Sequence, residues 1–551
     1  MARKGSSKTV KSGYVKKSSG KSPAAKKPDV KKRFQAFPSN SKRHITDPLH
    51  HNLYLYHPVD LIVDTPEFQR LRRLKQTSIS NLVYPNSDHS RFVHSLGTYC
   101  LALDFVKTLA GNQPELGITS RDILCVALAG LCHDLGHGPF SHTFETVIGH
   151  KSGWKHENMS KLIFRRIMTD DRVRAACEEF LDLEEDVDFI CELISPPTEF
   201  IQDGKWVLKG RSKEKAFLYG FVSNVHDSFD VDKFDYLLRD SKASAPTPIS
   251  YTSITRIRDG LRVGFDERLG HNRLVHAEKQ KEELMNVAMA RMKLHNNHYQ
   301  HKTCLGTEKM LCDALDLADP FFSFIGDDGE SYTLKTAHQD PGAFLKLDDS
   351  IYSMIRCMNS DLHPDIKKAQ KILEDMEYRK IPPLIVEIDG LSNQDSKEFE
   401  EYLREQIREK VDSVEMKQFF IKVKTLHCGM GLKTHPLSRV LVYNHKMDTL
   451  NLEDVDESWK RLWLTLPNGG VKKFLVYAHF GASEVLKEAL YEASRLYATM
   501  NGVPTPSKRN SPRQYGKMNE NMGVRNTNGK RRNGVDSPSA TPRSTRCAPK
   551  S

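Results

Sequence analysis

Three histidines and an aspartate lie within the stretch GLCHDLGHGPFSH, from Gly130 to His142. A His-Asp dipeptide alone is a weak sign of a metal site, because residue frequencies give on the order of one in a chain of this length. His94 in RFVHS supplies another imidazole, and Asp232 in DVDKFDYLLRD supplies another carboxylate. With His133 and Asp134 they form a set suited to Mn, Fe, Co, Ni or Zn that leaves positions open for water and substrate. Spacing alone leaves open that these are unrelated capping and surface residues.

Two further stretches have the residue types of a phosphate and nucleotide pocket. After Asp232, Tyr236 and Asp240 recur at helical spacing on one face, and Lys233 lies beside that face. Near residues 280–302 a second polar stripe interleaves aromatic and basic residues, which suits stacking of a base and neutralisation of phosphates. A solvated helix face remains the alternative for both stripes. The second stripe consists of Arg291, His295, Tyr299 and Lys302.

The pattern from about residue 58 to 320 is mostly helical, so helices must position these side chains. Thr119 and Asp122 form a capping-box pattern, and apolar residues at helical spacing follow them. Glycines and a proline come soon after His133-Asp134, so this helix should end at that pair. We also expect helices that begin at Thr65-Pro66 and that cover residues 91–110, 227–241 and 280–302.

After residue 379 the pattern changes to strands. The runs LIVEI, FFIKVK, RVLVY and FLVYAHF alternate with helices expected near residues 397–416 and 484–500. We therefore predict a mostly α protein, with a helical core, a smaller α+β C-terminal lobe and disordered basic tails. The predicted boundaries are residues 1–43 and 503–551 for the tails, 44–320 for the helical domain and 321–502 for the lobe.

The net charge of +11 is distributed unevenly along the 551 residues. Residues 1–43 carry fourteen Lys or Arg and one Asp, residues 503–551 carry eleven Lys or Arg and two acids, and the remainder is therefore near −11. An acidic central body gives no support for a nucleic-acid groove on the folded part. The tails contain few large apolar residues and cannot bury enough surface to offset the entropy of ordering.

The basic clusters KKPDVKKR and GKRR leave three readings open: nuclear import, contact with nucleic-acid phosphates, or solvation only. We expect a nuclear protein, with a cytoplasmic one as the alternative. Ten cysteines without a CxxC pair, and a first segment that is not apolar, fit a reducing compartment. The longest apolar run, Ile123 to Cys132, is about half of the ~20 residues that a membrane helix needs, so we expect no membrane span.

The order of these motifs resembles a known family. His94, then His133-Asp134, then Asp232 is the H…HD…D signature of the HD phosphohydrolase superfamily. From about residue 43 to 502 the chain is similar to the sterile-alpha-motif and HD-domain-containing deoxynucleoside triphosphate triphosphohydrolases, strongly over the HD part and thinly in the C-terminal lobe. The basic first 43 residues are too few for a sterile-alpha-motif domain, and we expect none. The shared stretches are DTPEFQRLRRLKQ, RFVHSLG, LAGLCHDLGHGPFSH, WKHE, DVDKFDYLLRD and YQHK.

The resemblance implies that a deoxynucleoside triphosphate (dNTP) is hydrolysed to a deoxynucleoside and intact triphosphate, with a divalent transition metal (Zn, Fe or Mn) and Mg on the nucleotide. An imidazolium near the departing 5′ oxygen is reasonable, because an alkoxide is a poor leaving group. The implied metal ligands are His94, His133, Asp134 and Asp232, and the implied catalytic residues are His137, His142, Glu145 and His156. The implied substrate-binding residues are Gln76, Arg91, Lys233, Tyr236, Asp240, Arg291, His295, Tyr299 and Gln300.

The family is also activated by nucleotides that bind between subunits, so the resemblance implies GTP or dGTP as activator and a dimer or tetramer. Three departures stand out. Glu145 replaces an aspartate, Thr46 replaces an amide-bearing residue, and the charged residues of Lys446–Glu457 are mostly acidic where the family has basic ones. The last two argue against a second regulatory site. The first regulatory site would consist of Arg43, Asp64, Gln69 and Arg72, for which an ordinary amphipathic helix is the alternative.

Two other functions stay open besides an enzyme that limits dNTP pools. One is another HD-type activity, such as a nucleotidase, phosphodiesterase or nuclease, which analysis of the products would distinguish. The other is a nucleic-acid-binding protein with a secondary HD activity, whose binding would vanish on deletion of residues 1–43 and 503–551. The triphosphohydrolase is favoured because every metal and phosphate position holds a competent residue.

Overall fold

The computed structural model describes residues 42–149, 153–244, 249–361, 363–391, 394–452 and 470–504. Nearly all of both predicted tails, and residues 453–457 of the acidic stretch Lys446–Glu457, lie outside the described residues.

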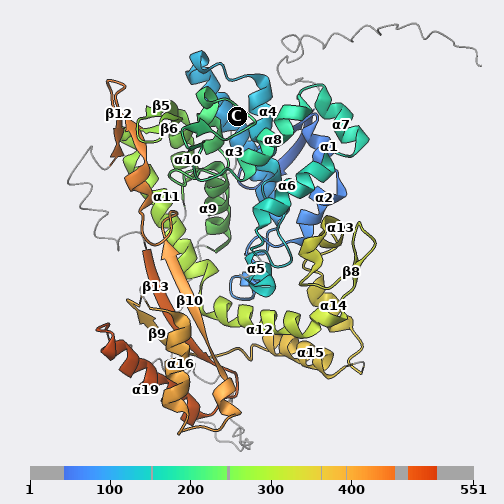
Figure 1. The fold of residues 1–551 in the computed structure, drawn as a ribbon, viewed down its shortest axis with the longest axis vertical. Coiled ribbons are helices and arrows are strands. Elements are labelled where there is room, and N and C mark those ends of the chain that lie inside the picture. The colour runs from blue at the N-terminus through green and yellow to red at the C-terminus, as the bar shows by residue number, and fades with distance from the viewer. Residues whose placement is uncertain are drawn as a thin grey trace, which may run out of the picture. The chain divides into compact units, whose positions relative to one another are not determined.

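Helices predominate among the described elements, as predicted (Figure 1). The helices are α1 Val59–Val63, α2 Pro66–Gln69, α3 Arg91–Asn112, α4 Ser120–Cys132, α5 His142–Ile148, α6 His156–Ile167, α7 Asp171–Glu178, α8 Leu183–Ile194, α9 Val231–Ser244, α10 Tyr251–Asp259, α11 Lys281–Leu294, α12 Lys302–Ala318, α13 Pro341–Phe344, α14 Ile351–Cys357, α15 Pro364–Glu377, α16 Ser396–Ile407 and α19 Glu484–Met500. The strands are β1 Lys42–Asp47, β2 His51–Tyr56, β3 Ile201–Gln202, β4 Lys205–Trp206, β5 Arg262–Asp266, β6 His271–Ala277, β7 Phe324–Ile325, β8 Ser331–Tyr332, β9 Leu384–Asp389, β10 Phe419–His427, β11 Leu441–Tyr443, β12 Thr449–Asn451 and β13 Gly470–Ala478.

The central helix α4 forms as the capping pattern predicts. Thr119 Oγ1 accepts from the backbone N–H of Asp122 at 3.1 Å, and Asp122 Oδ2 accepts from the backbone N–H of Thr119 at 2.9 Å. Every residue from Leu124 to Cys132 is buried, because α3 and α8 pack against this helix. The predicted end of the helix is confirmed, since α4 stops at Cys132 and the metal-type pair follows immediately.

Two predicted helices differ from those observed. The helix predicted over residues 227–241 begins only at Val231, because Asp227 accepts from the N–H of Phe229 at 3.0 Å and forms a turn instead. The helix predicted over 280–302 divides in two, since α11 ends at Leu294 and a π-helical turn, His295–Tyr299, precedes α12.

The C-terminal strands form two different sheets. β9, β10 and β13 make a three-stranded antiparallel sheet in the order β10-β13-β9, and helices α16 and α19 lie beside it (Figure 1). The RVLVY run, by contrast, becomes β11, which pairs in parallel with β6, placing Val442 opposite His276. The hairpins β1–β2 and β5–β6 were not predicted from the sequence.

The main hydrophobic core contains buried residues from Leu53 to Leu452, including a group between Phe322 and Met376. A second core lies between the three-stranded sheet and its two helices, and it extends from Val386 to Ala498. Side chains on both sides of residue 320 therefore contribute to the main core. The domain boundaries given above remain a prediction.

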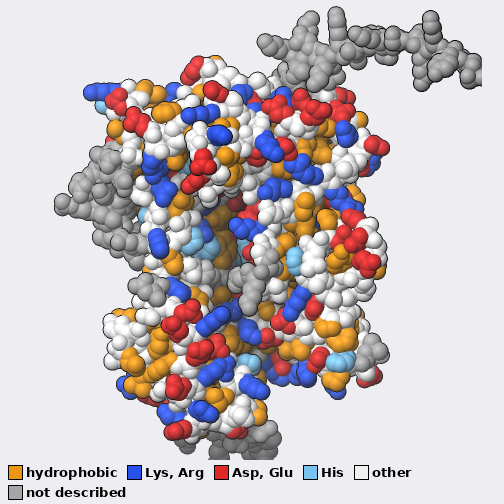
Figure 2. Space-filling view, viewed as in Figure 1, with side chains coloured by type: hydrophobic (Ala, Val, Ile, Leu, Met, Phe, Trp, Pro, Cys, Tyr) orange, Lys and Arg blue, Asp and Glu red, His pale blue; other side chains and the backbone are white. Residues whose placement is uncertain are grey.

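Surface features agree with a mixed charge distribution. On the face shown in Figure 2, Lys and Arg side chains are interspersed with Asp and Glu. Among the described residues, no helix is both long enough and apolar enough to cross a bilayer.

Candidate active site

The end of α4 positions the first two metal-type residues. His133 directly follows the last residue of the helix, and Asp134 comes next. His133 Nδ1 lies 2.9 Å from the carbonyl oxygen of Gly130, so this nitrogen donates its proton to the backbone. The other ring nitrogen, Nε2, is buried and makes no hydrogen bond of good geometry among the described residues.

His94 and Asp232 reach the same point from the first turns of α3 and α9. His94 Nε2 lies 3.0 Å from Asp232 Oδ1, and that oxygen lies 3.3 Å from His133 Nε2. Asp134 completes the group, with Oδ1 3.3 Å from His133 Nε2 and Oδ2 3.6 Å from His94 Nε2. Three helices thus bring two imidazoles and two carboxylates together.

This set of donors fits a divalent cation. Mixed nitrogen and oxygen ligands suit transition metals, and the buried Nε2 of His133 makes no hydrogen bond of good geometry with the described residues. Although burial opposes the charged form, hydrogen bonds to Asp232 and Asp235 raise the pKa of His94 to about 10. Burial opposes ionisation of Asp232 as well, yet the close contacts of its carboxylate with the His133 and His94 imidazoles lower its pKa. The group therefore attracts positive charge, which protons or a metal ion can supply.

A second histidine cluster depends on two glycines in the turn after α4. A Cβ on Gly136 would lie 2.1 Å from the carbonyl oxygen of His156, and a Cβ on Gly138 would lie 2.2 Å from the ring of Phe144. Only glycine permits such close approach. The turn thereby stacks His137 against His156, with ring centroids 3.9 Å apart.

Glu145 holds the outer histidines of this cluster. Its Oε1 lies 2.7 Å from His156 Nδ1 and 3.4 Å from His142 Nδ1. Burial would raise the pKa of Glu145, but hydrogen bonds from His142 and His156 hold it well below its usual value. The carboxylate is therefore charged and holds protons on both Nδ1 atoms. Burial and the Arg91 guanidinium lower the pKa of His137, whose ring is neutral at pH 7.

Arg91, at the start of α3, is a buried cation that contacts the metal-type group. Its NH1 donates to Asp134 Oδ2 at 2.6 Å, and its Nε donates to Ser141 Oγ at 2.7 Å. Nearby, the side-chain oxygen of Gln76 is buried without a hydrogen-bond partner among the described residues. A fixed guanidinium next to a cation site is suited to phosphate oxygens.

Another part of the pocket is built by α9 and the π-helical turn His295–Tyr299. Such turns occur often at functional sites. The Tyr299 hydroxyl donates to Asp240 Oδ2, while His89 Nε2 lies 2.7 Å from the other oxygen, Oδ1. Both oxygens of this buried carboxylate have partners, which fixes the position of the tyrosine ring.

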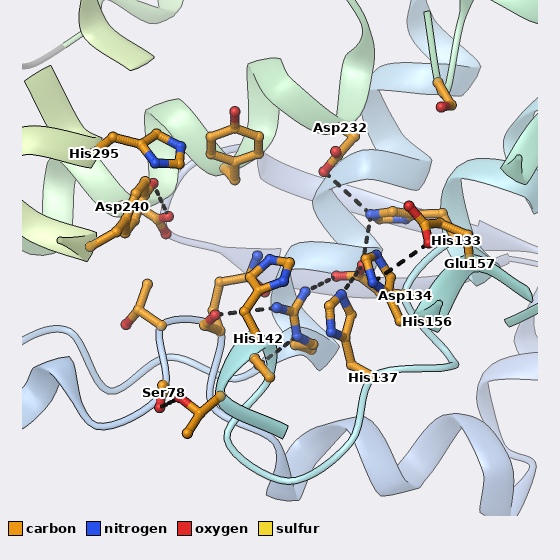
Figure 3. Close-up of a pocket in the computed structure, with 18 of the residues that line it drawn as sticks. Ser78, His133, Asp134, His137, His142, His156, Glu157, Asp232, Asp240 and His295 are labelled. Atoms are coloured by element: carbon orange, nitrogen blue, oxygen red, sulfur yellow. Dashed lines mark hydrogen bonds and ion pairs between the residues drawn. The ribbon is translucent and has the colours of Figure 1, made fainter. Parts of the chain in front are cut away.

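These groups surround one cavity of about 540 Å³, a volume in the range of small-molecule sites. Figure 3 shows His133, Asp134 and Asp232 on one side of it, with Asp240 and His295 across from them. The predicted site residues that line it are Gln76, Arg91, His133, Asp134, His137, His142, His156, Asp232, Tyr236, Asp240, Arg291, His295 and Tyr299.

Four predicted site residues are not in the cavity lining. His94 and Glu145 lie behind it and contact lining residues. Lys233 donates from Nζ to a serine hydroxyl at 2.6 Å, and Gln300 donates from Nε2 to the carbonyl oxygen of Thr425 at 2.9 Å. The last two side chains are therefore bonded to protein groups.

The four predicted regulatory residues form a separate group. Arg43 donates to both carboxylate oxygens of Asp64, at 2.7 and 2.5 Å. Arg72 donates from Nε to Gln69 Oε1 at 2.7 Å. The pKa of Asp64 is lowered mainly by the hydrogen bond from Arg43 and to a smaller extent by the charge of Arg72. Their role in nucleotide binding stays a prediction.

Residues that the sequence patterns did not single out also support or line the cavity. Asp235 and His89 lie outside the lining and hold other site residues. Asp235 contacts His94 and lies three residues after Asp232 on α9, a spacing that offered a signal. His89 offered little, because its partner Asp240 is 151 residues away. Further lining residues are Thr77, Ser78, Ser141, Thr143, Glu157, Ile194, Val222, Ser223, Asp230 and Glu308.

Comparison with known proteins agrees with this geometry. The model of the HD domain family matches residues 91–205. The deoxynucleoside triphosphate triphosphohydrolase SAMHD1 of Bos taurus is 35% identical over 72% of this chain and 69% of its own length. The chain belongs to this triphosphohydrolase family. SAMHD1 of Gallus gallus is 38% identical over 61% of the chain and 54% of its own length. The SAMHD1 homolog of Dictyostelium discoideum is 34% identical over 63% of the chain and 61% of its own length.

Family membership confirms the resemblance drawn from the motifs. The chain spans about half to two thirds of the length of the SAMHD1 relatives described above. The segment matched by the HD family model contains His94, His133 and Asp134, whereas Asp232 lies beyond it and is brought to the same site by α9.

Proposed function

We propose that the chain hydrolyses dNTPs, dGTP among them, to a deoxynucleoside and inorganic triphosphate, and thereby limits dNTP pools. The observation that carries this proposal is the pairing, around one cavity, of a buried His/Asp metal-type group with imidazoles anchored by Glu145. The relatives named deoxynucleoside triphosphate triphosphohydrolase support the substrate class.

His94, His133, Asp134 and Asp232 would hold the divalent metal, for which Zn, Fe and Mn are the candidates, with Mg on the nucleotide. When bound, the metal supplies Lewis acidity toward a phosphate oxygen and the attacking water. Arg91 contributes a fixed positive charge for the phosphate chain. Because Arg91 is already held by Asp134 and Ser141, it needs no rearrangement when substrate binds.

The reaction requires a proton donor at the deoxynucleoside side. Water adds to the α-phosphorus, the bond from phosphorus to the 5′ oxygen breaks, and that oxygen takes up a proton. Glu145 holds the Nδ1 protons of His142 and His156, so the second proton of the imidazolium form lies on Nε2 and can be donated from there. The products are the deoxynucleoside and a triphosphate that keeps all three phosphorus atoms.

Tyr299 and Asp240 would select the sugar. Asp240 holds the Tyr299 hydroxyl, and the ring cannot move aside without breaking that buried hydrogen bond. A ring fixed against the 2′ carbon excludes a 2′ hydroxyl by steric clash, and this accounts for a preference for deoxyribonucleotides.

The test is product analysis after incubation of the purified chain with dGTP and Mn²⁺. We expect deoxyguanosine and triphosphate in equal amounts, and release of orthophosphate or pyrophosphate would contradict this reaction. Asp232→Ala should lose all activity, because it removes a carboxylate shared by both imidazoles. Asp188→Ala, which removes an exposed carboxylate paired with Arg165, is the matched control and should keep wild-type activity.

We further propose that GTP or dGTP activates the chain at Arg43, Asp64, Gln69 and Arg72 and that the active form is a dimer or tetramer. The exposed Arg43–Asp64 ion pair supports this, because an acid and a base side by side can recognise a guanine edge and a phosphate. Rates of dGTP hydrolysis with and without GTP, with mass measured by light scattering, test both parts. Full activity without GTP in a dimer would contradict activation.

The basic tails support a nuclear location and an added contact with nucleic acid. A fluorescent fusion that lacks residues 1–43 and 503–551 should lose nuclear accumulation and weaken RNA binding. Unchanged location and binding would contradict the proposal.

A further inference from the structure

Behind the metal ligand His94 lies a second buried carboxylate, Asp235. Its Oδ2 lies 2.8 Å from His94 Nδ1, on the side of the ring that faces away from Asp232. This contact keeps a proton on Nδ1 of His94, so a metal ion bound by this ring would take Nε2, the nitrogen that faces Asp232. Asp235 is fully buried, and Arg239 donates to it from Nε at 2.9 Å and from NH2 at 3.0 Å.

A further hydrogen-bond partner of Asp235 comes from a distant part of the sequence. His50, in the turn between β1 and β2, places Nε2 2.6 Å from Asp235 Oδ1, and both side chains are completely buried. The turn is fixed in its own right, because Asp47 Oδ1 accepts from the backbone N–H of His50 at 2.9 Å. Asp47 Oδ2 also accepts from Arg239 NH1 at 3.0 Å.

The four hydrogen bonds described use both oxygens of Asp235. Oδ1 contacts His50 and Arg239, and Oδ2 contacts His94 and Arg239. If His50 were lost, Oδ1 would keep only Arg239, and the carboxylate could turn toward the guanidinium and away from His94. The observed position of Asp235 requires glycine at residue 97, because a Cβ there would lie 2.0 Å from Asp235 Oδ1.

We propose that His50 is a positioning residue for the metal ligand His94 and acts through Asp235. The N-terminal hairpin β1–β2 is thus part of the apparatus that orients the metal site, although it contributes no residue to the cavity. This inference rests on the metal site of the proposed function. Outer-shell groups of this kind typically change metal affinity by about 10- to 100-fold.

The test is Mn²⁺ affinity of the full chain, measured by competition with a fluorescent chelator. Asp235→Asn should weaken binding by about 10- to 100-fold, because an amide can offer His94 Nδ1 a donor in place of an acceptor. His50→Ala should weaken it by about tenfold, and His50→Gln, which can still donate to Asp235, should recover part of the loss. In steady-state kinetics at saturating Mn²⁺, kcat should fall more than KM rises.

His44→Ala is the matched control, because His44 lies on the same hairpin and its side chain contacts the exposed Asn52 and the half-buried Tyr54 instead of Asp235. It should bind Mn²⁺ within twofold of wild type. His50→Leu fills the same space without donating, and it provides the test if the alanine variant does not fold. Wild-type Mn²⁺ affinity in a folded His50→Ala or His50→Leu variant would overturn the inference. Absence of Mn²⁺ binding in the wild-type chain would instead overturn the metal site itself.

Discussion

Glu145 shows how much of the proposed chemistry depends on one charge. It contacts His142 and His156 together, so it determines which nitrogen of each ring carries a proton. Glutamate reaches one methylene further than the aspartate that the resemblance leads one to expect. Helix α5 begins at His142 and helix α6 begins at His156, and the longer Glu145 side chain contacts both imidazole rings.

Replacement of Glu145 by glutamine keeps the shape and removes the charge. We expect kcat for dGTP to fall by about 10²- to 10⁴-fold, the usual contribution of a positioned acid or base, while Mn²⁺ affinity stays unchanged. Glu157→Gln is the comparison, because Glu157 Oε2 lies 3.7 Å from His156 Nδ1 and is more exposed. An equal loss in both variants would argue that the local negative charge matters rather than the hydrogen bonds of Glu145.

Site residues that belong to a recognisable local motif could be predicted from the sequence. Site residues that are identified only by a contact with a distant residue could not. His133, Asp134 and Asp232 could be predicted because their types and order are distinctive. His89 and His50 could not, because each is defined by a carboxylate on α9 more than a hundred residues away. No local pattern reports such a contact.

Among the elements, α4 has the most direct influence on the site, because its last turn determines where His133 stands. Its start is fixed by the Thr119 and Asp122 capping box, and Asp122 also accepts from Arg211 Nε at 2.7 Å. The stability of the cap therefore affects the register of the whole buried helix.

Thr119→Ala should lower the free energy of unfolding by about 1 kcal/mol, because it removes the cap acceptor at the N-terminus of α4. Urea titration followed by circular dichroism measures this loss. Thr119→Ser keeps the hydroxyl and should retain most of the stability. A loss of the same size in the serine variant would assign the effect to the threonine methyl group.

The segment before α14 introduces a pH dependence. Asp349 accepts from the backbone N–H of Phe140 at 2.7 Å and of Lys75 at 2.9 Å, and burial raises its pKa to about 6. A folded pKa above the ordinary value near 4 means that the folded state holds the proton more tightly. Stability should therefore fall as pH rises from about 4 to 6, by on the order of 3 kcal/mol.

Melting temperatures of wild type and Asp349→Asn between pH 4 and 7 measure this contribution. The difference in melting temperature between the two proteins should change with pH between pH 4 and 6 and stay constant above pH 6. A difference that is constant over the whole range would show that Asp349 does not titrate there.

Element boundaries were predictable where caps and glycines mark them, as at both ends of α4. They were not predictable at the π-helical turn, because apolar and polar spacing continues through it from α11 toward α12. The pairing of β11 with β6 was also inaccessible, since strand propensity shows that a strand forms but does not identify its partner.

At the scale of the whole molecule, segments distant in sequence meet at the cavity. The main core includes residues from Leu53 to Leu452, and β11 joins the hairpin β5–β6 in one sheet. Hydrogen bonds between Gln300, which follows the π-helical turn, and β10 also connect segments that are distant in sequence. Gln300, next to Tyr299, donates to the carbonyl oxygen of Thr425 and accepts from its N–H at 2.9 Å.

This two-way bond makes the Thr425 amide a reporter of events in the cavity. If a nucleotide orders Tyr299, it also steadies Gln300, and the opening motion that exposes the Thr425 N–H becomes rarer. Hydrogen–deuterium exchange at Thr425 should then slow by about tenfold with a nonhydrolysable dGTP analogue. The amide of Val476, which lies opposite Ile421 farther along the same strand pair, should change little. The three-stranded sheet would thus register substrate occupancy through one amide side chain, without contributing a ligand of its own.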